Sequence, residues 1–211
     1  MNSNKEYVKV AEEFARWSSD QFNDFNEFLI LYDYSEKIRQ LLEATAKRFF
    51  SDLFWIYIDR IIQNASRLTD PPKTRKNRNF LIRSIHNYFI GYSEYDAIGA
   101  EKLIISIETE AEKVRLWRNK LISHYDQDIA LDKQKVVDKF ILSNFKVLYD
   151  NLEKYVSLLY KSFDKAFKYI HVSGSIDLIG ALKESYALNE IKERDINLYD
   201  NIMKNSPFYE I

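Results

Sequence analysis

Glycine and proline, the residues on which tight turns depend, are almost absent from this chain of 211 residues, which has 4 Gly and 3 Pro. Glycine suits turns because it adopts positive φ, and proline suits them because its ring fixes φ. A sheet protein of this length needs many turns, whereas a helical protein needs few. The chain is therefore predicted to be all-helical, and it is long enough to bury a hydrophobic core.

The longest apolar pattern runs from Glu36 to Leu68. Its members recur at steps of three, four and five residues, which is the spacing of a helix with one buried face. They include Leu41, Leu42, Phe49, Leu53, Ile56, Ile61, Ala65 and Leu68. The run Asp70-Pro71-Pro72 ends this predicted helix, because proline cannot continue the hydrogen-bond ladder.

Shorter patterns predict further helices on both sides of this one. They cover residues 4–18, 20–34, 79–90, from about 96 to the polar stretch 123–128, 132–169, and one or two helices between 174 and 204. Long amphipathic helices with short connections normally pack antiparallel. We expect an antiparallel bundle over residues 1–170, with its core over about 20–165. Residues 171–211 are expected to form a C-terminal helical extension packed on the same domain.

Composition excludes several classes of protein. There is no cysteine, so disulfides, thiolate metal ligands and cysteine nucleophiles are ruled out. No apolar run approaches the ~20 residues of a membrane-spanning helix, and the first residues do not lead into an apolar signal core. A cytoplasmic protein without membrane contact is expected. The formal net charge of −1 means that any contact with nucleic acid depends on a local basic patch.

Cofactor and metal motifs are absent from the sequence. The four glycines are scattered, so they form no phosphate-binding loop. The three histidines, His86, His124 and His171, do not have a recognised metal-ligand spacing. We therefore predict no cofactor and no metal site, and we interpret His86 and His171 as structural.

One segment near the end of the helix predicted from about residue 96 carries a different pattern, Arg118-Asn119-Lys120-Leu121-Ile122-Ser123-His124. It resembles the motif of the HEPN superfamily, in which an arginine is followed by a polar residue and, four to six residues on, by a histidine. The run from Ser66 to Lys73, which closes the earlier long helix, is similar to the AbiU-type branch, whose proteins are linked to bacterial abortive infection of phage. The resemblance covers roughly residues 20–165 and implies a HEPN-type bundle with extra N- and C-terminal helices.

The resemblance also implies a homodimer in which two arginine–histidine motifs face each other. Many HEPN proteins are metal-independent endoribonucleases that act as toxins, whereas others are non-catalytic modules that bind RNA, a nucleotide or a partner protein. In toxins with an antitoxin partner protein that modifies them, the modified tyrosine lies two residues after the histidine. Here that position is Asp126, and the tyrosine is the adjacent Tyr125, which puts this form of silencing in doubt.

Metal-free RNA cleavage requires an acid–base group and a positive charge near the phosphate. His124 suits the first role because imidazole titrates near pH ~6.5. Arg118 suits the second because its guanidinium is always ionised and offers forked donors. Asn119 is expected to position the phosphate or the histidine, and Asp126 either orients His124 or caps the next turn.

Helix geometry separates the two main residues of this motif. Six residues along an ideal helix give a rise of about 9 Å and a rotation of about 240°. Arg118 and His124 therefore cannot meet on one face of a straight helix. Either the chain curls back before His124, or a second subunit completes the site across a two-fold axis.

A basic loop follows the long helix, with Lys73, Arg75, Lys76 and Arg78. Two interpretations remain open for it: contact with an RNA backbone, or a solvated loop between helices. Arg83, a little further along, is assigned to the same basic group. Arg67 and Asp70 are predicted to take part in helix termination and in an internal ion pair.

Overall fold

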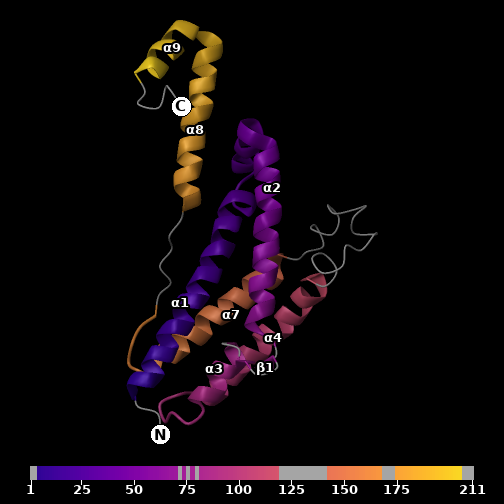
Figure 1. The fold of residues 1–211 in the computed structure, drawn as a ribbon, viewed down its shortest axis with the longest axis vertical. Helices are drawn as coiled ribbons and strands as arrows, with labels where there is room; N and C mark the ends of the chain where they lie inside the picture. The colour runs from indigo at the N-terminus through magenta and orange to yellow at the C-terminus, as the bar shows by residue number, and fades with distance from the viewer. Residues whose placement is uncertain are drawn as a thin grey trace. The chain divides into compact units, whose positions relative to one another are not determined.

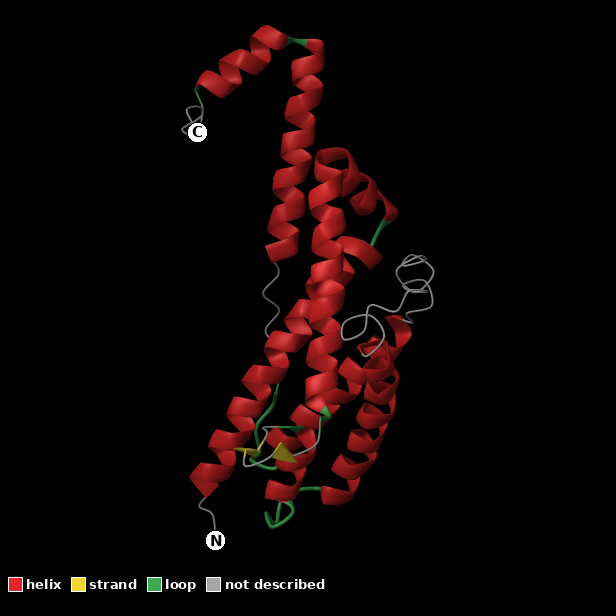
Figure 2. Ribbon diagram, turned by 45° about the vertical axis from the view of Figure 1, so that its right-hand side comes forward, coloured by secondary structure: helices red, strands yellow, loops and turns green. Residues whose placement is uncertain are grey.

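The computed structural model describes residues 4–70, 73–74, 77–78, 81–118, 142–167 and 174–205. These residues form an all-α helical bundle, as predicted, with one short hairpin (Figures 1 and 2). The elements are α1 (Asn4–Phe28), the π-helix η1 (Leu29–Asp33), α2 (Glu36–Leu68), β1 (Lys73–Thr74), β2 (Asn77–Arg78), α3 (Ile82–Phe89), α4 (Ala97–Arg118), α7 (Leu142–Lys161), α8 (Gly174–Arg194) and α9 (Ile196–Lys204). None of the described helices is long and apolar enough to cross a membrane.

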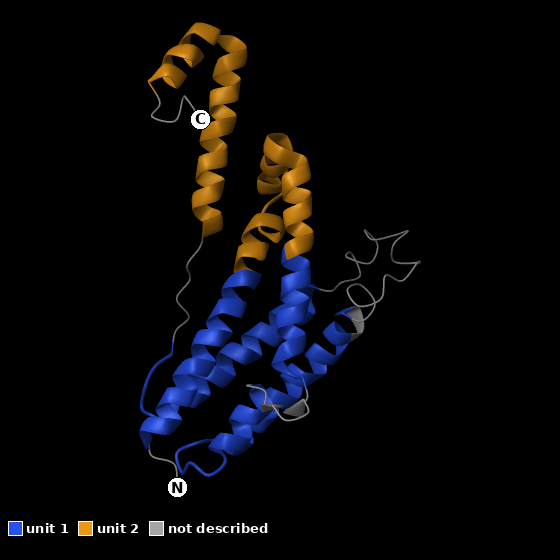
Figure 3. Cartoon of the chain, viewed as in Figure 1, with its two compact units in different colours: residues 1–25, 57–171 blue, residues 26–56, 172–211 orange. Residues whose placement is uncertain are grey.

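The chain divides into two compact units (Figure 3). The first unit comprises Met1–Phe25 and Tyr57–His171, and the second comprises Asn26–Ile56 and Val172–Ile211. The sequence boundary expected at residue 170 thus lies next to a boundary between the units. Residues 26–56 belong to the second unit, together with the C-terminal segment. Packing of that segment on the first domain stays a prediction.

Aromatic side chains join α1 to α7 in the first unit. The rings of Phe14 and Tyr155 meet edge to face, with centroids 5.8 Å apart. The rings of Phe25 and Tyr149 stack, with centroids 4.8 Å apart. The order of these contacts along α1 is reversed along α7, so the two helices are antiparallel. Rings of this size bury large apolar areas and stabilise the contact accordingly.

α4 packs against both α3 and α7. Its fully buried residues recur at steps of three and four, and they are Ala100, Ile104, Ile107, Ala111 and Val114. Each buried isoleucine or valine side chain contributes about 1.5–3 kcal/mol relative to an exposed one. Asn151 of α7 also donates a hydrogen bond to Ser106 Oγ of α4 at 2.9 Å. α4 is thereby fixed along most of its length.

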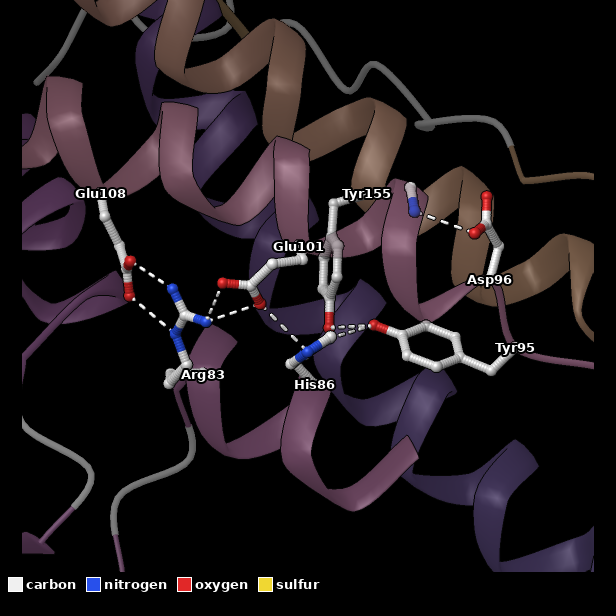
Figure 4. A network of polar contacts seen from close by, with 8 residues as sticks. Arg83, His86, Tyr95, Asp96, Glu101, Glu108 and Tyr155 are labelled. Carbon is white, nitrogen blue, oxygen red and sulfur yellow. Dashed lines mark hydrogen bonds and ion pairs between the residues drawn. The ribbon is translucent and has the colours of Figure 1, made fainter. Parts of the chain in front are cut away.

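The start of α4 is determined by Asp96. Its Oδ1 accepts a hydrogen bond from the backbone N–H of Gly99 at 2.8 Å (Figure 4), which satisfies a donor that the first helical turn leaves unpaired. A Cβ at position 99 would collide with the Asp96 carboxylate. Glycine therefore leaves room for the cap.

α1 is one continuous helix from Asn4 to Phe28, where the sequence analysis predicted two helices separated near residue 19. Serine commonly caps helices, so Ser18 and Ser19 are compatible with a break there. In the structure Ser18 Oγ donates to the carbonyl of Phe14, and Ser19 Oγ donates to that of Ala15, both at 2.8 Å. Hydroxyls bonded to the preceding turn do not interrupt the helix.

The bounds of α2 agree with the prediction, but its buried face does not follow the predicted stripe throughout. Ala46 has non-helical angles (φ −156°, ψ 66°), so the turns before and after it do not share one helical register. Phe49 and Ile56, which the pattern placed on the buried face, are 60% and 61% exposed. Phe50 and Ile58 are buried instead. Ile56 and Ile58 both follow the break, and the five-residue step from Ile56 to Ile61 in the predicted stripe is a rotation of about 140°, so Ile56 does not share the buried face of Ile61.

α7 ends at Lys161, earlier than the predicted end at residue 169. The chain leaves the helix through a turn in which Asp164 has a positive φ of 55°. The N–H of Lys165 donates to the carbonyl of Tyr160 at 3.1 Å, which pairs a helix-terminal acceptor. The predicted start of this helix, at residues 132–141, lies outside the described residues.

Aromatic packing also holds together the part of the second unit around η1. Phe28 and Tyr32 place their rings against that of Phe54, with centroids 5.5 and 5.1 Å apart. The Tyr32 hydroxyl donates to the carbonyl of Phe50 at 2.9 Å. These interactions connect the end of the first helical segment to α2 within this unit.

α8 and α9 confirm the prediction of one or two helices before Lys204. At the start of α8, the backbone N–H of Ser175 donates to the Glu27 carboxylate at 2.7 Å. At the start of α9, Asp195 accepts from the N–H of Leu198 at 3.0 Å, which is an N-terminal cap.

Candidate functional site

Arg118, the residue that the sequence analysis selected for phosphate binding, lies in the last turn of α4. Its Nη1 is 3.5 Å from Oδ1 of Asp70, at the end of α2. The two side chains are 30% and 31% exposed. The guanidinium is thus oriented by a carboxylate and also reaches solvent, as a phosphate-binding group must.

The preceding arginine of α4 contacts the same end of α2. Arg115 Nη1 donates to the backbone carbonyl of Thr69 at 3.1 Å. The last carbonyls of a helix have no partner within it, and a cation there is also favoured by the helix dipole. Arg115 therefore caps α2, and Arg118 pairs with the residue that follows. Since the two arginines are three residues apart, they share one face of α4.

Asp70 forms an ion pair, as predicted, but its partner is Arg118 of α4, which the sequence did not indicate. Arg67 Nη2 lies 3.4 Å from Gln63 Oε1, one turn back along the same helix. The last turn of α2 also closes with the short-range bonds Thr69 N–H to Ser66 carbonyl and Asp70 N–H to Arg67 carbonyl, at 3.3 and 3.4 Å. These bonds agree with the prediction that the helix terminates here.

The other predicted catalytic residues, Asn119 and His124, lie outside the described residues, and so does Asp126, which was predicted to orient His124 or to cap the next turn. Of the basic loop, Arg75 and Lys76 also lie outside them. Lys73 and Arg78 belong to β1 and β2, which pair antiparallel with Lys73 opposite Arg78. The described part of the predicted basic loop is therefore a hairpin.

A second polar cluster, which the sequence analysis did not identify, joins α3 to α4 (Figure 4). Arg83 of α3 lies between two carboxylates of α4. Its Nη1 donates to both oxygens of Glu101 at 2.7 Å. Its Nε donates to Oε1 of Glu108 at 3.0 Å, and its Nη2 donates to Oε2 of the same residue. The charge of Arg83 is satisfied by these partners, so neither RNA contact nor a solvated loop, the two interpretations left open for the basic group, describes this residue.

His86, one turn after Arg83, extends this cluster into the core and is 5% exposed. Its Nε2 is 3.1 Å from Oε2 of Glu101, and its Nδ1 is 2.8 Å from the hydroxyl of Tyr95. A carboxylate only accepts, so Nε2 carries the proton and Nδ1 accepts from Tyr95. The Tyr95 and Tyr155 hydroxyls are 3.4 Å apart. The structural role predicted for His86 agrees with this arrangement.

Burial and charge set the protonation states in this cluster. Burial lowers the pKa of His86, an effect that Glu101 opposes. The hydrogen bond from Arg83 lowers the pKa of Glu101, and the hydrogen bond to Glu108 raises that of Arg83. Burial raises the pKa of Tyr95 to about 12. At neutral pH the cluster therefore holds a neutral imidazole beside charged partners.

We expect the lowered pKa of His86 to make the protein less stable in mild acid. The unfolded chain takes up a proton as the pH falls through ~6.5, whereas folded His86 stays neutral until a lower pH. The free energy of unfolding should then fall by up to about 1.4 kcal/mol per pH unit below that point. The groups that interact with His86 among the described residues are Arg83, Glu101, Glu108 and Tyr95.

The variant His86→Gln isolates this contribution, because glutamine does not titrate while the other two histidines remain. Urea unfolding at pH ~7.5 and ~5.5, on either side of the ordinary imidazole pKa, measures both proteins. We expect the wild type to lose more stability than the variant between these values. Equal losses would contradict the assignment. The window lies above the titration of carboxylates such as Glu101, whose lowered pKa acts only at more acidic pH.

The pattern that identifies the second cluster is visible in the sequence only in part. Arg83 and His86 are three residues apart, and Glu101 and Glu108 are seven apart, so each pair shares a helix face. Which pair faces which depends on the packing of α3 on α4. The cluster is satisfied internally, which leaves the end of α4 at Arg115 and Arg118 as the better candidate for binding an external anion.

Comparison of the chain with protein-family models, with curated proteins and with solved structures found no match.

Proposed function

We propose that this protein is a metal-independent endoribonuclease of the HEPN type that acts as a toxin or phage-defence effector. In this proposal Arg118 and His124 form a composite site at a homodimer interface, and Asn119 assists them. A cytoplasmic location and an antitoxin partner protein belong to the same proposal.

The placement of Arg118 is the observation that carries this proposal. It lies in the last turn of α4, is partly exposed and is held by Asp70 at 3.5 Å. Asn119 follows it directly, and His124 comes five residues after that. An arginine oriented in this way is suited to the charge that develops on a phosphate during transfer.

The reaction follows from the chemistry of these groups. A base removes the proton of the ribose 2′-hydroxyl, and the 2′-oxygen attacks the adjacent phosphorus. The bond from phosphorus to the 5′-oxygen breaks, and an acid returns a proton to that oxygen. His124 supplies the acid–base function, and Arg118 stabilises the negative charge on the phosphorane.

A second copy of the chain gives this site its acid and its base. With one histidine per subunit, two facing motifs place two imidazoles at one phosphate. A two-fold interface produces that arrangement because each surface meets its own copy. The rotation of about 240° between positions 118 and 124 on a straight helix also favours completion by the partner.

A non-catalytic HEPN module that binds RNA, a nucleotide or a partner protein is the second candidate. The net charge of −1 favours it, since sequence-independent RNA affinity depends on neutralising phosphates. This candidate uses the same arginine end of α4 but assigns no chemical step to His124.

Incubation of the purified protein with total RNA in EDTA is expected to produce fragments with 2′,3′-cyclic phosphate and 5′-hydroxyl ends. The 5′-hydroxyl ends should accept label from a polynucleotide kinase without phosphatase treatment. Sedimentation equilibrium on the same sample should give the mass of two chains. RNA that stays intact would contradict the nuclease and favour the binding module. Cleavage that requires added magnesium would contradict the metal-independent mechanism.

A further inference from the structure

The second unit buries few apolar side chains and exposes many. It comprises Asn26–Ile56 and Val172–Ile211 and is orange in Figure 3. Eight of the twelve exposed large apolar side chains among the described residues lie in this unit, although the first unit is larger. The described apolar side chains that it buries are Phe28, Leu31, Leu42, Phe50 and Ile179. Burial of apolar surface is the main source of stability in a folded domain, so this unit lacks most of a core of its own.

Part of the exposed apolar surface is a stripe on α2, after the break at Ala46. Phe49 and Ile56 are 60% and 61% exposed. They are seven residues apart, so they share one helix face, and the half-buried Leu53 lies on that face between them. Steps of four and three residues are the spacing with which one helix packs against another. This α2 stripe, formed by Phe49, Leu53 and Ile56, therefore has the pattern of a helix-packing surface.

The helices α8 and α9, which form a C-terminal arm, carry the rest of the exposed apolar surface of the unit apart from Tyr34. The buried residues of α8 are Ser175 and Ile179, and α9 has none. The exposed apolar residues of the arm are Ile176, Tyr186, Ile196, Leu198 and Ile202. Isolated helices shorter than about 12–15 residues are marginal in water unless an apolar face is packed, and α9 has nine residues. The arm therefore needs a surface that covers it.

The extent of this apolar surface matches one side of a protein dimer. An aromatic side chain has about 150–250 Å² of surface, and aliphatic ones have somewhat less. The eight side chains are 38–80% exposed, so together they present roughly 700 Å². A stable interface buries about 800 Å² on each partner.

The charges beside this surface fit a second copy of the same unit. Residues 192–195 of the arm read Lys-Glu-Arg-Asp, and Arg48 and Asp52 lie beside the α2 stripe. Charges of both signs give no strong field that would select a polyanion or a polycation. An apolar surface with flanking charges of both signs can be complementary to itself, as a two-fold interface requires.

We propose that the α2 stripe and the C-terminal arm form an interface with the second unit of another copy of this chain. The interface contains no residue of the Arg118–His124 motif, so it goes beyond the proposed function and does not depend on RNA cleavage. It gives the apolar side chains of α9 the cover that they lack in one copy.

Sedimentation equilibrium of the full-length protein at about 1 M salt is expected to give the mass of two chains, because apolar burial, unlike ion pairing, is not screened by salt. The variants Phe49→Glu/Ile56→Glu and Leu198→Glu/Ile202→Glu should each weaken dimerisation about 100-fold or more, since each removes two buried apolar side chains.

The matched control is Ile98→Glu/Ile105→Glu on α4, in the first unit. These isoleucines are 75% and 53% exposed and are also seven residues apart. The control should keep the mass of two chains.

The absence of cysteine from the chain allows a second measurement on nearly wild-type protein. Ile56→Cys and Ile202→Cys each place one thiol in the proposed interface, and Ile105→Cys places one on α4. At a protein concentration about 100 times the dissociation constant, fewer than about a tenth of the chains are free, so maleimide labelling in the interface should be about tenfold slower than in dilute protein. Labelling of Ile105→Cys should not change with concentration.

A monomeric wild type would overturn the inference, as would a dimer that persists in both glutamate variants. Labelling at positions 56 and 202 that is equally slow at every protein concentration would also overturn it, because the chain would then cover this surface itself. The proposed function fails separately. A dimer that persists in the variants and cleaves RNA rejects this interface and keeps the nuclease. Dissociation by the variants, with no cleavage by the wild type, keeps the interface and rejects the nuclease.

Discussion

Replacement of His124 by alanine is expected to lower the rate of RNA cleavage by about 10²–10⁴-fold, the range of general acid–base catalysis. The proposed reaction needs a group that accepts and returns a proton near neutral pH, and imidazole is the side chain whose ordinary pKa lies there. In cells, the same change should relieve growth inhibition by the overexpressed protein. Single-turnover cleavage of a defined RNA, followed on a gel, measures the effect.

His171→Ala is the control for this prediction, because His171 is the third histidine of the chain and lies outside the motif. It should cleave at the wild-type rate. Arg118→Gln should lose about 10²–10³-fold, as expected when one stabilising donor is removed from a transition state. Undiminished cleavage by His124→Ala would reject the assigned mechanism. Binding that persists in a protein that never cleaves would favour the non-catalytic module.

Replacement of Arg83 by methionine is expected to lower the free energy of unfolding by about 2–3 kcal/mol, because hydrogen bonds between charged groups contribute about that much. The change leaves the carboxylates of Glu101 and Glu108 without the guanidinium that lies between them. It also removes the hydrogen bonds that connect α3 to α4 at this position. For a chain of this length the melting temperature should fall by about 4–12 °C. Urea denaturation and calorimetry measure both quantities.

Arg16→Met supplies the comparison, since Arg16 makes an exposed pair with Glu13 on α1. A surface pair of this kind is worth about 0–1 kcal/mol. The double variant Arg83→Met/Glu108→Gln should recover part of the loss, because one unpaired charge is then removed. If Arg83→Met is no less stable than Arg16→Met, the cluster of Figure 4 does not contribute to stability.

The sequence predicted the helices that have a regular apolar spacing and a proline or glycine just after their last turn. The helix from Glu36 to Leu68 has the predicted bounds because its apolar period is long and two prolines follow it. The short helix before Gly91 was predicted for a similar reason. The continuous α1 was missed because Ser18 and Ser19 are ambiguous. Their hydroxyls cap helices or bond within them, and the sequence alone does not distinguish the two.

Features that depend on contacts distant in sequence were the ones that could not be predicted. Arg83 looked like a member of the basic loop because its partners, Glu101 and Glu108, are 18 and 25 residues away. The break at Ala46 has no sequence signal such as glycine or proline, so it was not predicted. For Arg118 the motif supplied the residue, and the structure added its partner Asp70, 48 residues away in the sequence.

The contacts of α4 with α3 and α7 fix its position along the helix axis. Glu101 and Arg115 are fourteen residues apart on α4, which corresponds to a rise of about 21 Å along the helix. A slip of α4 by one turn against its neighbours would carry its arginines about 5.4 Å away from the end of α2. Buried residues in the middle of α4, such as Ile104 and Ile107, therefore determine where Arg115 and Arg118 lie relative to the end of α2, although they are far from those arginines.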